Sequence, residues 1–182
     1  TLEEHLDRLE MVLKRLVETG LKLKPSKCRL LQRRIVFLGH VVTEDGVSTD
    51  PAKTEQIKKW PRPASFREVR GFLGLCGYYR KFIDRYAELA APLTSMLKKG
   101  YKFCWSDEAE VAFEKLKAVL TSPPILAMPK DEGLFILDTD ACDVSIGAVL
   151  SQVQEGHERV IAYAAKVLQP AQRNYCVTRR EL

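Results

Sequence analysis

Two aspartates separated by one residue are the strongest candidates for chemistry in this sequence. Asp138 and Asp140 follow an apolar run, Phe135–Leu137, and a second apolar segment, Ile146–Leu150, comes after a short turn. Side chains alternate faces along a strand, so an antiparallel hairpin here would point both carboxylates the same way. Two such carboxylates repel each other unless a cation or a cationic side chain lies between them. The pattern fits a site for a hard divalent cation, Mg²⁺ or Mn²⁺, bound through oxygen ligands.

The alternative is a polar hairpin end that simply faces solvent, and spacing alone favours it because Asp-rich turns are common. A second feature changes that balance. Thr178 with Glu181 three residues later is a capping-box pattern, which predicts that a helix begins there.

Together these segments resemble the start of a ribonuclease H domain of the LTR-retrotransposon kind. The matching motifs are Thr139-Asp-Ala-Cys142, Ile146-Gly-Ala-Val-Leu150, Val160-Ile-Ala-Tyr-Ala164 and Thr178-Arg-Arg-Glu-Leu182. The resemblance implies that Asp140 and Glu181 are the first two metal-binding catalytic carboxylates. Cys142 stands where the family usually has Ser, which is not a ligand, and Asp138 does not match a ligand position.

Composition is that of an ordinary globular protein. The 182 residues are 46% hydrophobic and 29% charged, enough for one or two small domains. The five cysteines are odd in number and widely spaced, so we expect neither a disulfide framework nor a zinc site, and a reducing intracellular setting fits best. Apolar runs are short and the N-terminus lacks a signal-peptide pattern, so no membrane partner is expected. The sequence does not begin with Met, and we expect it to be a piece of a longer chain.

Charge is distributed unevenly along the chain. Residues 48–103 carry twelve Lys or Arg against five Asp or Glu, a net +7, whereas residues 104–182 carry a net −4. A basic segment of this size suggests a polyanion such as nucleic acid as partner. The alternative is a solvated basic helix face.

The first part of the chain predicts a helix over residues 1–19, with Thr1 and Glu4 as a capping box and Gly20 as the C-terminal stop. Ile35–Val42 predicts a strand, followed by a turn at Glu44–Gly46. Gly39 in mid-strand is costly unless a backbone or ligand comes close, and a bulge is an equal alternative. His40 and His157 are isolated, and each is expected to be a surface residue.

The sequence predicts four helices after this strand. Asp50–Trp60 begins with an N-cap and Pro51, and a helix from Ser65 to about Phe82 opens with another capping box. Its expected core stripe is Val69, Phe72, Leu73, Cys76 and Tyr79. Gly71, Gly74 and Gly77 form a bare strip, which could admit a neighbouring helix or a nucleic-acid backbone, and the nearby cations Arg67, Arg70, Arg80 and Lys81 favour the latter. A further helix is expected over Tyr86–Leu97, with Pro92 as a kink or as a boundary between two shorter helices. Another is expected from Ser106 to Leu120, with Val111, Phe113, Leu116 and Leu120 inward.

A longer series of motifs extends the resemblance over the whole chain. In order they are Val36-Phe-Leu-Gly-His-Val41, Trp60-Pro-Arg-Pro63, Phe72-Leu-Gly-Leu75, Tyr78-Tyr-Arg-Lys-Phe-Ile83, Ala91-Pro-Leu-Thr94 and Phe103-Cys-Trp-Ser-Asp107. The series resembles gypsy-type LTR-retrotransposon Pol polyproteins. It implies an α+β chain in four parts: the C-terminal palm of a reverse transcriptase (1–46), a helical thumb (47–100), a connection segment (101–132), and the first three antiparallel strands of a ribonuclease H-like fold (133–182).

The resemblance also implies a function. The parent protein would be an RNA-directed DNA polymerase and ribonuclease H that uses Mg²⁺ or Mn²⁺, with the remainder of Pol as a partner. Leu38, Gly39 and His40 would form a primer grip, and the thumb helix with Arg67, Arg70, Gly71, Gly74, Gly77, Arg80 and Lys81 would hold primer–template duplex or RNA–DNA hybrid. The chain has no Tyr-x-Asp-Asp turn, and it stops one residue after Glu181. We therefore expect no turnover from this piece alone, and a non-catalytic nucleic-acid-binding remnant or a functionless remnant are the alternatives.

Overall fold

The computed structural model describes residues 1–100, 102–176 and 179–180, and the chain forms two compact units, residues 1–33 and 34–182. The first unit contains α1 (Leu2–Glu18) and the short 3-10 helix η1 (Pro25–Lys27). Thr1 and Glu4 form the predicted capping box, and Gly20 has a positive φ of 71° just beyond the helix end. Both predicted ends of this helix are confirmed.

The second unit begins with an antiparallel sheet of β1 (Ile35–Phe37), β2 (His40–Thr43) and β3 (Gly46–Thr49), in that order. The prediction of one strand over residues 35–42 was wrong. Leu38 and Gly39 both have positive φ, 48° and 71°, and they turn the chain back so that Phe37 pairs with His40. A hairpin therefore replaces the single strand, and Gly39 lies in its turn rather than in a bulge.

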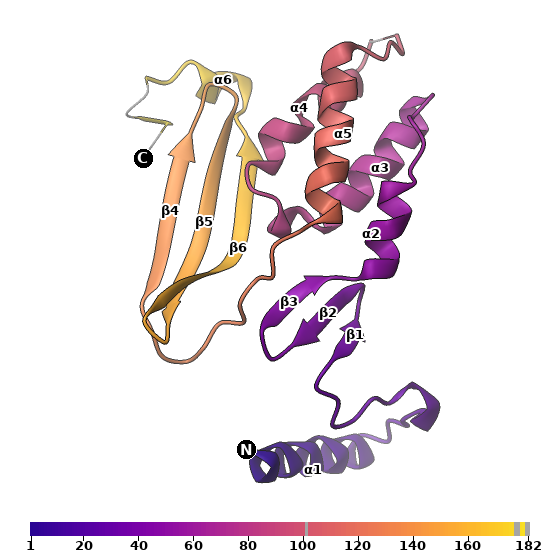
Figure 1. Cartoon of the computed structure of the whole chain (residues 1–182), viewed down its shortest axis with the longest axis vertical. Helices are drawn as coiled ribbons and strands as arrows, with labels where there is room; N and C mark the ends of the chain where they lie inside the picture. The colour runs from indigo at the N-terminus through magenta and orange to yellow at the C-terminus, as the bar shows by residue number, and fades with distance from the viewer. Residues whose placement is uncertain (101, 177–178, 181–182) are drawn as a thin grey trace. The chain divides into compact units, whose positions relative to one another are not determined.

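Four α-helices follow this sheet (Figure 1). They are α2 (Pro51–Lys58), α3 (Phe66–Tyr78), α4 (Tyr86–Met96) and α5 (Asp107–Thr121), with the 3-10 helix η2 (Arg80–Phe82) between α3 and α4. Asp50, Ser65 and Ser106 each accept a hydrogen bond from a first-turn backbone N–H, as their capping patterns predicted. One detail differs from prediction, because α3 ends at Tyr78. Pro92 lies inside α4 and does not divide it into two helices.

One aromatic core holds these helices together. The Phe72 ring of α3 lies 4.6 Å from the Phe113 ring of α5, and both side chains are buried. Val69, Phe72, Cys76 and Tyr79 are all buried, so the predicted core stripe of α3 is confirmed, with Leu73 partly buried. Val111 was wrongly assigned to the core, because its side chain on α5 is 52% exposed.

A second antiparallel sheet contains β4 (Phe135–Ala141), β5 (Ser145–Gln154) and β6 (His157–Val167), followed by the short helix α6 (Pro170–Arg173). The sheet packs beside the helices, with β6 contacting α4 and η2 (Figure 1). The carboxylate hairpin forms in the predicted place: Asp138 lies opposite Val149 and Asp140 opposite Gly147.

The segment between α5 and β4 ties the two sheets to each other. Leu126 pairs with Val47 of β3 through two backbone hydrogen bonds of 2.7 and 2.9 Å, and the Ala127 N–H donates to the carbonyl of Val160 in β6 at 2.8 Å. Gln152, fully buried on β5, satisfies both ends of its amide on the backbone of Lys130 and Glu132. Since buried amides are costly when unpaired, this network fixes where β4 begins. No helix in the described part of the chain has the length and apolar character needed to cross a membrane.

Candidate functional site

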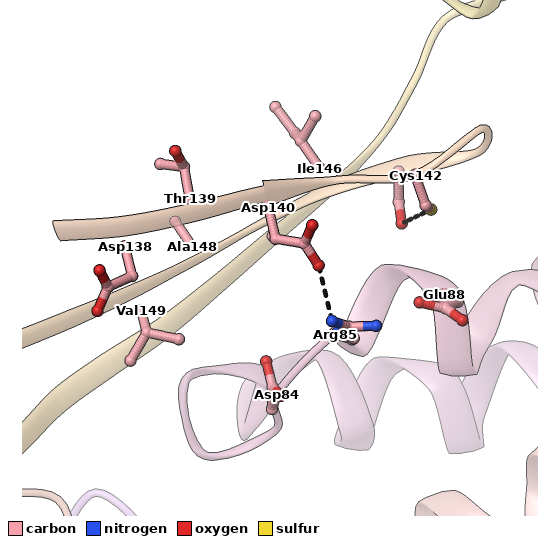
Figure 2. A pocket seen from close by; sticks show the side chains of 12 residues that line it. Asp84, Arg85, Glu88, Asp138, Thr139, Asp140, Cys142, Ile146, Ala148 and Val149 are labelled. Atoms are coloured by element: carbon pink, nitrogen blue, oxygen red, sulfur yellow. Dashed lines mark hydrogen bonds and ion pairs between the residues drawn. The ribbon is translucent and has the colours of Figure 1, made fainter. Parts of the chain in front are cut away.

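A shallow pocket lies between the carboxylate hairpin and the start of α4. Figure 2 shows Asp138, Asp140 and Val149 pointing from the sheet toward the helices, whereas Thr139 points to the opposite face. The two aspartates therefore share a face, as strand alternation requires. Asp84 and Glu88 line the helical side of the same pocket, so the site is rich in carboxylates from both sides.

Arg85 supplies the positive charge in this pocket. Its guanidinium donates a hydrogen bond to the Asp140 carboxylate at 2.7 Å (Figure 2). Arg85 is the N-cap residue of α4 and has a left-handed φ of 49°, which aims it at the sheet. Sequence reasoning required a metal or a cationic side chain near these carboxylates but did not identify Arg85, which is 55 positions away from Asp140. Both side chains are more than half exposed, so the pair adds at most about 1 kcal/mol to stability.

The pocket fits a hard cation in part. The Asp140 carboxylate is the kind of ligand that Mg²⁺ takes, and Asp138 stands two positions away on the same face. No cluster of three potential His, Cys, Asp or Glu ligands occurs among the residues that the structure describes. The predicted second ligand, Glu181, lies outside the described residues, as does the capping residue Thr178.

Cys142 lies in the same pocket and hydrogen-bonds through its sulfur with the Ser145 hydroxyl at 3.3 Å. That hydrogen bond lowers the pKa of the Cys142 thiol below its usual value. The contact closes the tip of the β4–β5 hairpin next to Asp140.

The exposed face of α3 forms a second candidate surface. Arg67, Arg70, Gly71 and Gly74 are all exposed and recur at helical spacing, opposite the buried stripe. Neither arginine forms an ion pair with any residue in the described ranges. Both guanidinium groups are therefore available to an external anion.

The glycine strip on α3 is open rather than packed. A Cβ added at Gly74 would meet no described atom within 4 Å, and those at Gly71 and Gly77 would make only ordinary contacts of 4.0 and 3.6 Å with Trp60 and Tyr86. A packed neighbouring helix was the alternative explanation for these glycines, and no helix in the described ranges covers Gly74. The strip is therefore available for close approach by a ligand.

The Leu38–Gly39 turn lies at the C-terminal end of that face. The Tyr78 hydroxyl, from the last residue of α3, donates a hydrogen bond to the Leu38 carbonyl. His40 was expected to be a surface residue rather than a ligand, and it is partly exposed. Its ring lies against the rings of Tyr78, Tyr79 and Phe82, and its Nε2 atom is buried without a described partner. Leu38 and Gly39 thus form a turn against α3, with His40 directly after it, and Tyr78 is a contact that the sequence analysis did not assign to this turn.

Arg80 and Lys81 lie on η2 rather than on α3. Arg80 is exposed, but Lys81 is partly buried, with its ammonium 5.1 Å from the Phe82 ring centre. Burial lowers the pKa of Lys81 below its ordinary value. Of the predicted cations, Arg67 and Arg70 are the two that share the exposed glycine face.

Comparison with known proteins defines the class. A family described as an RNase H-like domain found in reverse transcriptase matches residues 105–182, which include α5 as well as the second sheet. The chain is 44% identical over its full length to a retrovirus-related Pol polyprotein from transposon 297 of Drosophila melanogaster, and 37% identical over 99% of its length to that from transposon opus of the same organism. It is also 33% identical over 98% of its length to the transposon Tf2-3 polyprotein of Schizosaccharomyces pombe.

The fold has solved relatives. A foamy viral protease-reverse transcriptase, described as dRH and solved in complex with ds DNA, matches 100% of this chain at 25% identity with a TM-score of 0.82. The foamy viral protease-reverse transcriptase in complex with RNA/DNA hybrid matches the same fraction, also with a TM-score of 0.82, at 24% identity, which speaks to the fold alone. This chain covers 32% and 25% of those two chains.

The fold and these similarities define a reverse-transcriptase-type chain with an RNase H-like domain. The chain is similar over its whole length to retrotransposon Pol polyproteins and corresponds to a segment of one, since it spans 17% and 19% of the length of the two Drosophila relatives.

The open glycine strip generates a stability prediction. Replacing Gly74 with Ala should raise the free energy of unfolding by up to about 1 kcal/mol, because Ala is the better helix former and its methyl group meets nothing. Urea denaturation of the purified chain would measure the change.

Gly46→Ala is the matched control. Gly46 has φ 138°, and a Cβ there would overlap the Leu126 carbonyl oxygen, so this variant should lose stability. A loss of stability in Gly74→Ala as large as that in Gly46→Ala would mean that something does pack against the strip.

Proposed function

We propose that this segment grips a primer–template duplex or RNA–DNA hybrid for a retrotransposon reverse transcriptase and supplies part of a ribonuclease H metal site. The proposed grip on nucleic acid rests on one surface of the structure. On it the exposed arginines and bare glycines of α3 lead directly to the Leu38–Gly39 turn. The parent would be an RNA-directed DNA polymerase with hybrid endonuclease activity.

Each feature of this surface suits a nucleic-acid backbone. Glycines let a sugar–phosphate chain approach a helix closely, and the two free guanidinium groups offer bidentate hydrogen bonds to phosphate. The exposed apolar side chains of Phe37 and Leu38 at the hairpin end suit contact with sugars and bases. These contacts read shape and charge rather than base sequence, as a polymerase that copies any template requires.

The domain assignment follows from the same proposal. Residues 1–46 would be the end of the palm with its primer grip, 47–100 the thumb, 101–132 the connection and 133–182 the opening of the ribonuclease H-like domain. Support comes from the motif series and from the similarity to Pol polyproteins over the whole chain. The remainder of the polyprotein would be the partner of this segment.

The proposed ribonuclease H role rests on Asp140. Its carboxylate would hold Mg²⁺ or Mn²⁺ together with Glu181, and bound metal would supply activation of water and stabilisation of the leaving oxygen during RNA cleavage. Asp138 shares the face but would not be a ligand. Arg85 would orient the Asp140 carboxylate and balance its charge.

Salt dependence tests the nucleic-acid surface. Each neutralised phosphate contributes about 0.9 to the slope of log affinity against log salt. Arg67→Ala/Arg70→Ala should therefore flatten the slope for an RNA–DNA hybrid by about 2, measured by fluorescence anisotropy across a salt series.

The control removes the same charge elsewhere. Lys115 on α5 and Arg159 on β6 are both exposed, and Lys115→Ala/Arg159→Ala should leave the slope nearly unchanged. Equal flattening by both variants would show that net charge alone, and not the α3 face, sets the affinity.

Substitution of the two aspartates tests the metal site. In a longer Pol protein that contains this segment, Asp140→Asn should abolish cleavage of the RNA strand, whereas Asp138→Asn should reduce it far less. Both variants should keep the wild-type melting temperature within a few degrees, since the exposed Asp140–Arg85 pair adds little stability. If Asp138→Asn abolished cleavage and Asp140→Asn did not, Asp138 would be the metal ligand and the assignment of Asp140 would be wrong.

A further inference from the structure

Leu38, the first residue of the Leu38–Gly39 turn, is held in an unfavourable backbone conformation. Both residues have φ in the left-handed region, the geometry of the two-residue turn that matches strand twist in a hairpin. Gly adopts this conformation freely, but Leu does so rarely. Such a conformation persists only where the surrounding structure fixes it.

Two consecutive tyrosines provide that fixation. The Tyr79 hydroxyl donates a hydrogen bond of 2.9 Å to the Gly39 carbonyl, and the Tyr78 hydroxyl donates one to the Leu38 carbonyl. Each tyrosine is 40 positions away in sequence from the carbonyl that it binds. Both carbonyls of the turn are thus attached to the C-terminal end of α3.

Further contacts complete the attachment. The Asp50 N–H donates to the Gly39 carbonyl at 3.1 Å, and Nδ1 of His40 lies 2.9 Å from the Leu38 carbonyl oxygen. The His40 ring packs 5.3 Å from the Tyr78 ring and 5.6 Å from the Tyr79 ring.

The turn is in close contact with Tyr79. A Cβ at Gly39 would lie 3.0 Å from the Tyr79 hydroxyl oxygen, closer than ordinary van der Waals contact, so close approach favours glycine here in addition to its φ. Tyr79 is 1% exposed, and burial raises the pKa of its hydroxyl, which favours the protonated form that donates this hydrogen bond. Tyr78 is half exposed and lies at the boundary between the α3 face and the hairpin.

We propose that Tyr78 and Tyr79 are positioning residues that lock the Leu38–Gly39 turn to α3, so that the turn and the exposed face of α3 form one rigid nucleic-acid-binding surface. The proposal rests on the function proposed above for that surface. It adds that the primer grip and the thumb helix move as one body. In agreement, the hairpin and α3 fall within the same compact unit, residues 34–182.

The test removes the hydroxyls and keeps the rings. Tyr78→Phe/Tyr79→Phe should accelerate hydrogen exchange of the His40 and Asp50 amides by about tenfold or more, because local opening of the turn no longer breaks two hydrogen bonds. His40 is paired with Phe37 across the turn, and the Asp50 N–H donates to the Gly39 carbonyl. Amides in the middle of α3 should exchange at the wild-type rate. Affinity of the chain for a short RNA–DNA hybrid should fall several-fold.

Tyr86→Phe is the matched control. Its hydroxyl donates to the Leu73 carbonyl at 3.3 Å within the helices, so its loss should not change exchange at the turn. Tyr78→Phe alone provides a second variant that leaves the buried Tyr79 untouched. It should give a smaller acceleration confined to the turn.

The outcomes separate the lock from the proposed function. Unchanged exchange at His40 and Asp50 in the double variant overturns the lock, and so does equal acceleration throughout α3, which would reflect global destabilisation. Faster exchange at the turn with unchanged hybrid affinity supports the lock and contradicts the role of this surface in binding nucleic acid.

Discussion

Burial of one face of α3 is the constraint on which the rest of this structure depends. Val69, Phe72, Cys76 and Tyr79 bury one side of the helix against α2, α4 and α5. A helix with one face buried must present the opposite face to solvent, and here that face contains arginines and glycines. The same packing places Tyr79 at the end of the exposed face, and the hairpin turn that Tyr79 binds lies there too. Packing and proposed binding are therefore two consequences of a single helical pattern.

Local sequence signals predicted most of the elements. Asp50, Ser65 and Ser106 marked helix starts because capping depends on residues within one turn of each other. The carboxylate hairpin was also predictable, since strand alternation places Asp138 and Asp140 on one face whatever lies opposite. What local signals missed were contacts between distant segments. The hairpin at Leu38 was read as one strand because its turn is maintained by tyrosines that lie 40 positions away.

An ion pair between Arg85 and Asp140 connects the basic part of the chain to the acidic part. Residues 48–103 are strongly basic and residues 104–182 acidic, and Arg85 from the first meets Asp140 from the second. No periodicity in the sequence could have paired them, because the contact depends on how α4 packs beside the sheet. If Asp140 holds a cation, as we propose, the cation and the guanidinium must share its two carboxylate oxygens. An exposed pair of this kind is weak enough to rearrange at little cost.

Direct mapping of the bound surface tests the central claim, that the α3 face and the Leu38–Gly39 turn bind nucleic acid together. A short RNA–DNA hybrid would be titrated into the ¹⁵N-labelled chain while backbone amide chemical shifts are followed. We predict shift changes at Leu38–His40 and along Arg67–Gly74 that saturate at the same hybrid concentration. Changes confined to α5 or to the open face of the β4–β6 sheet, with α3 unaffected, would contradict it.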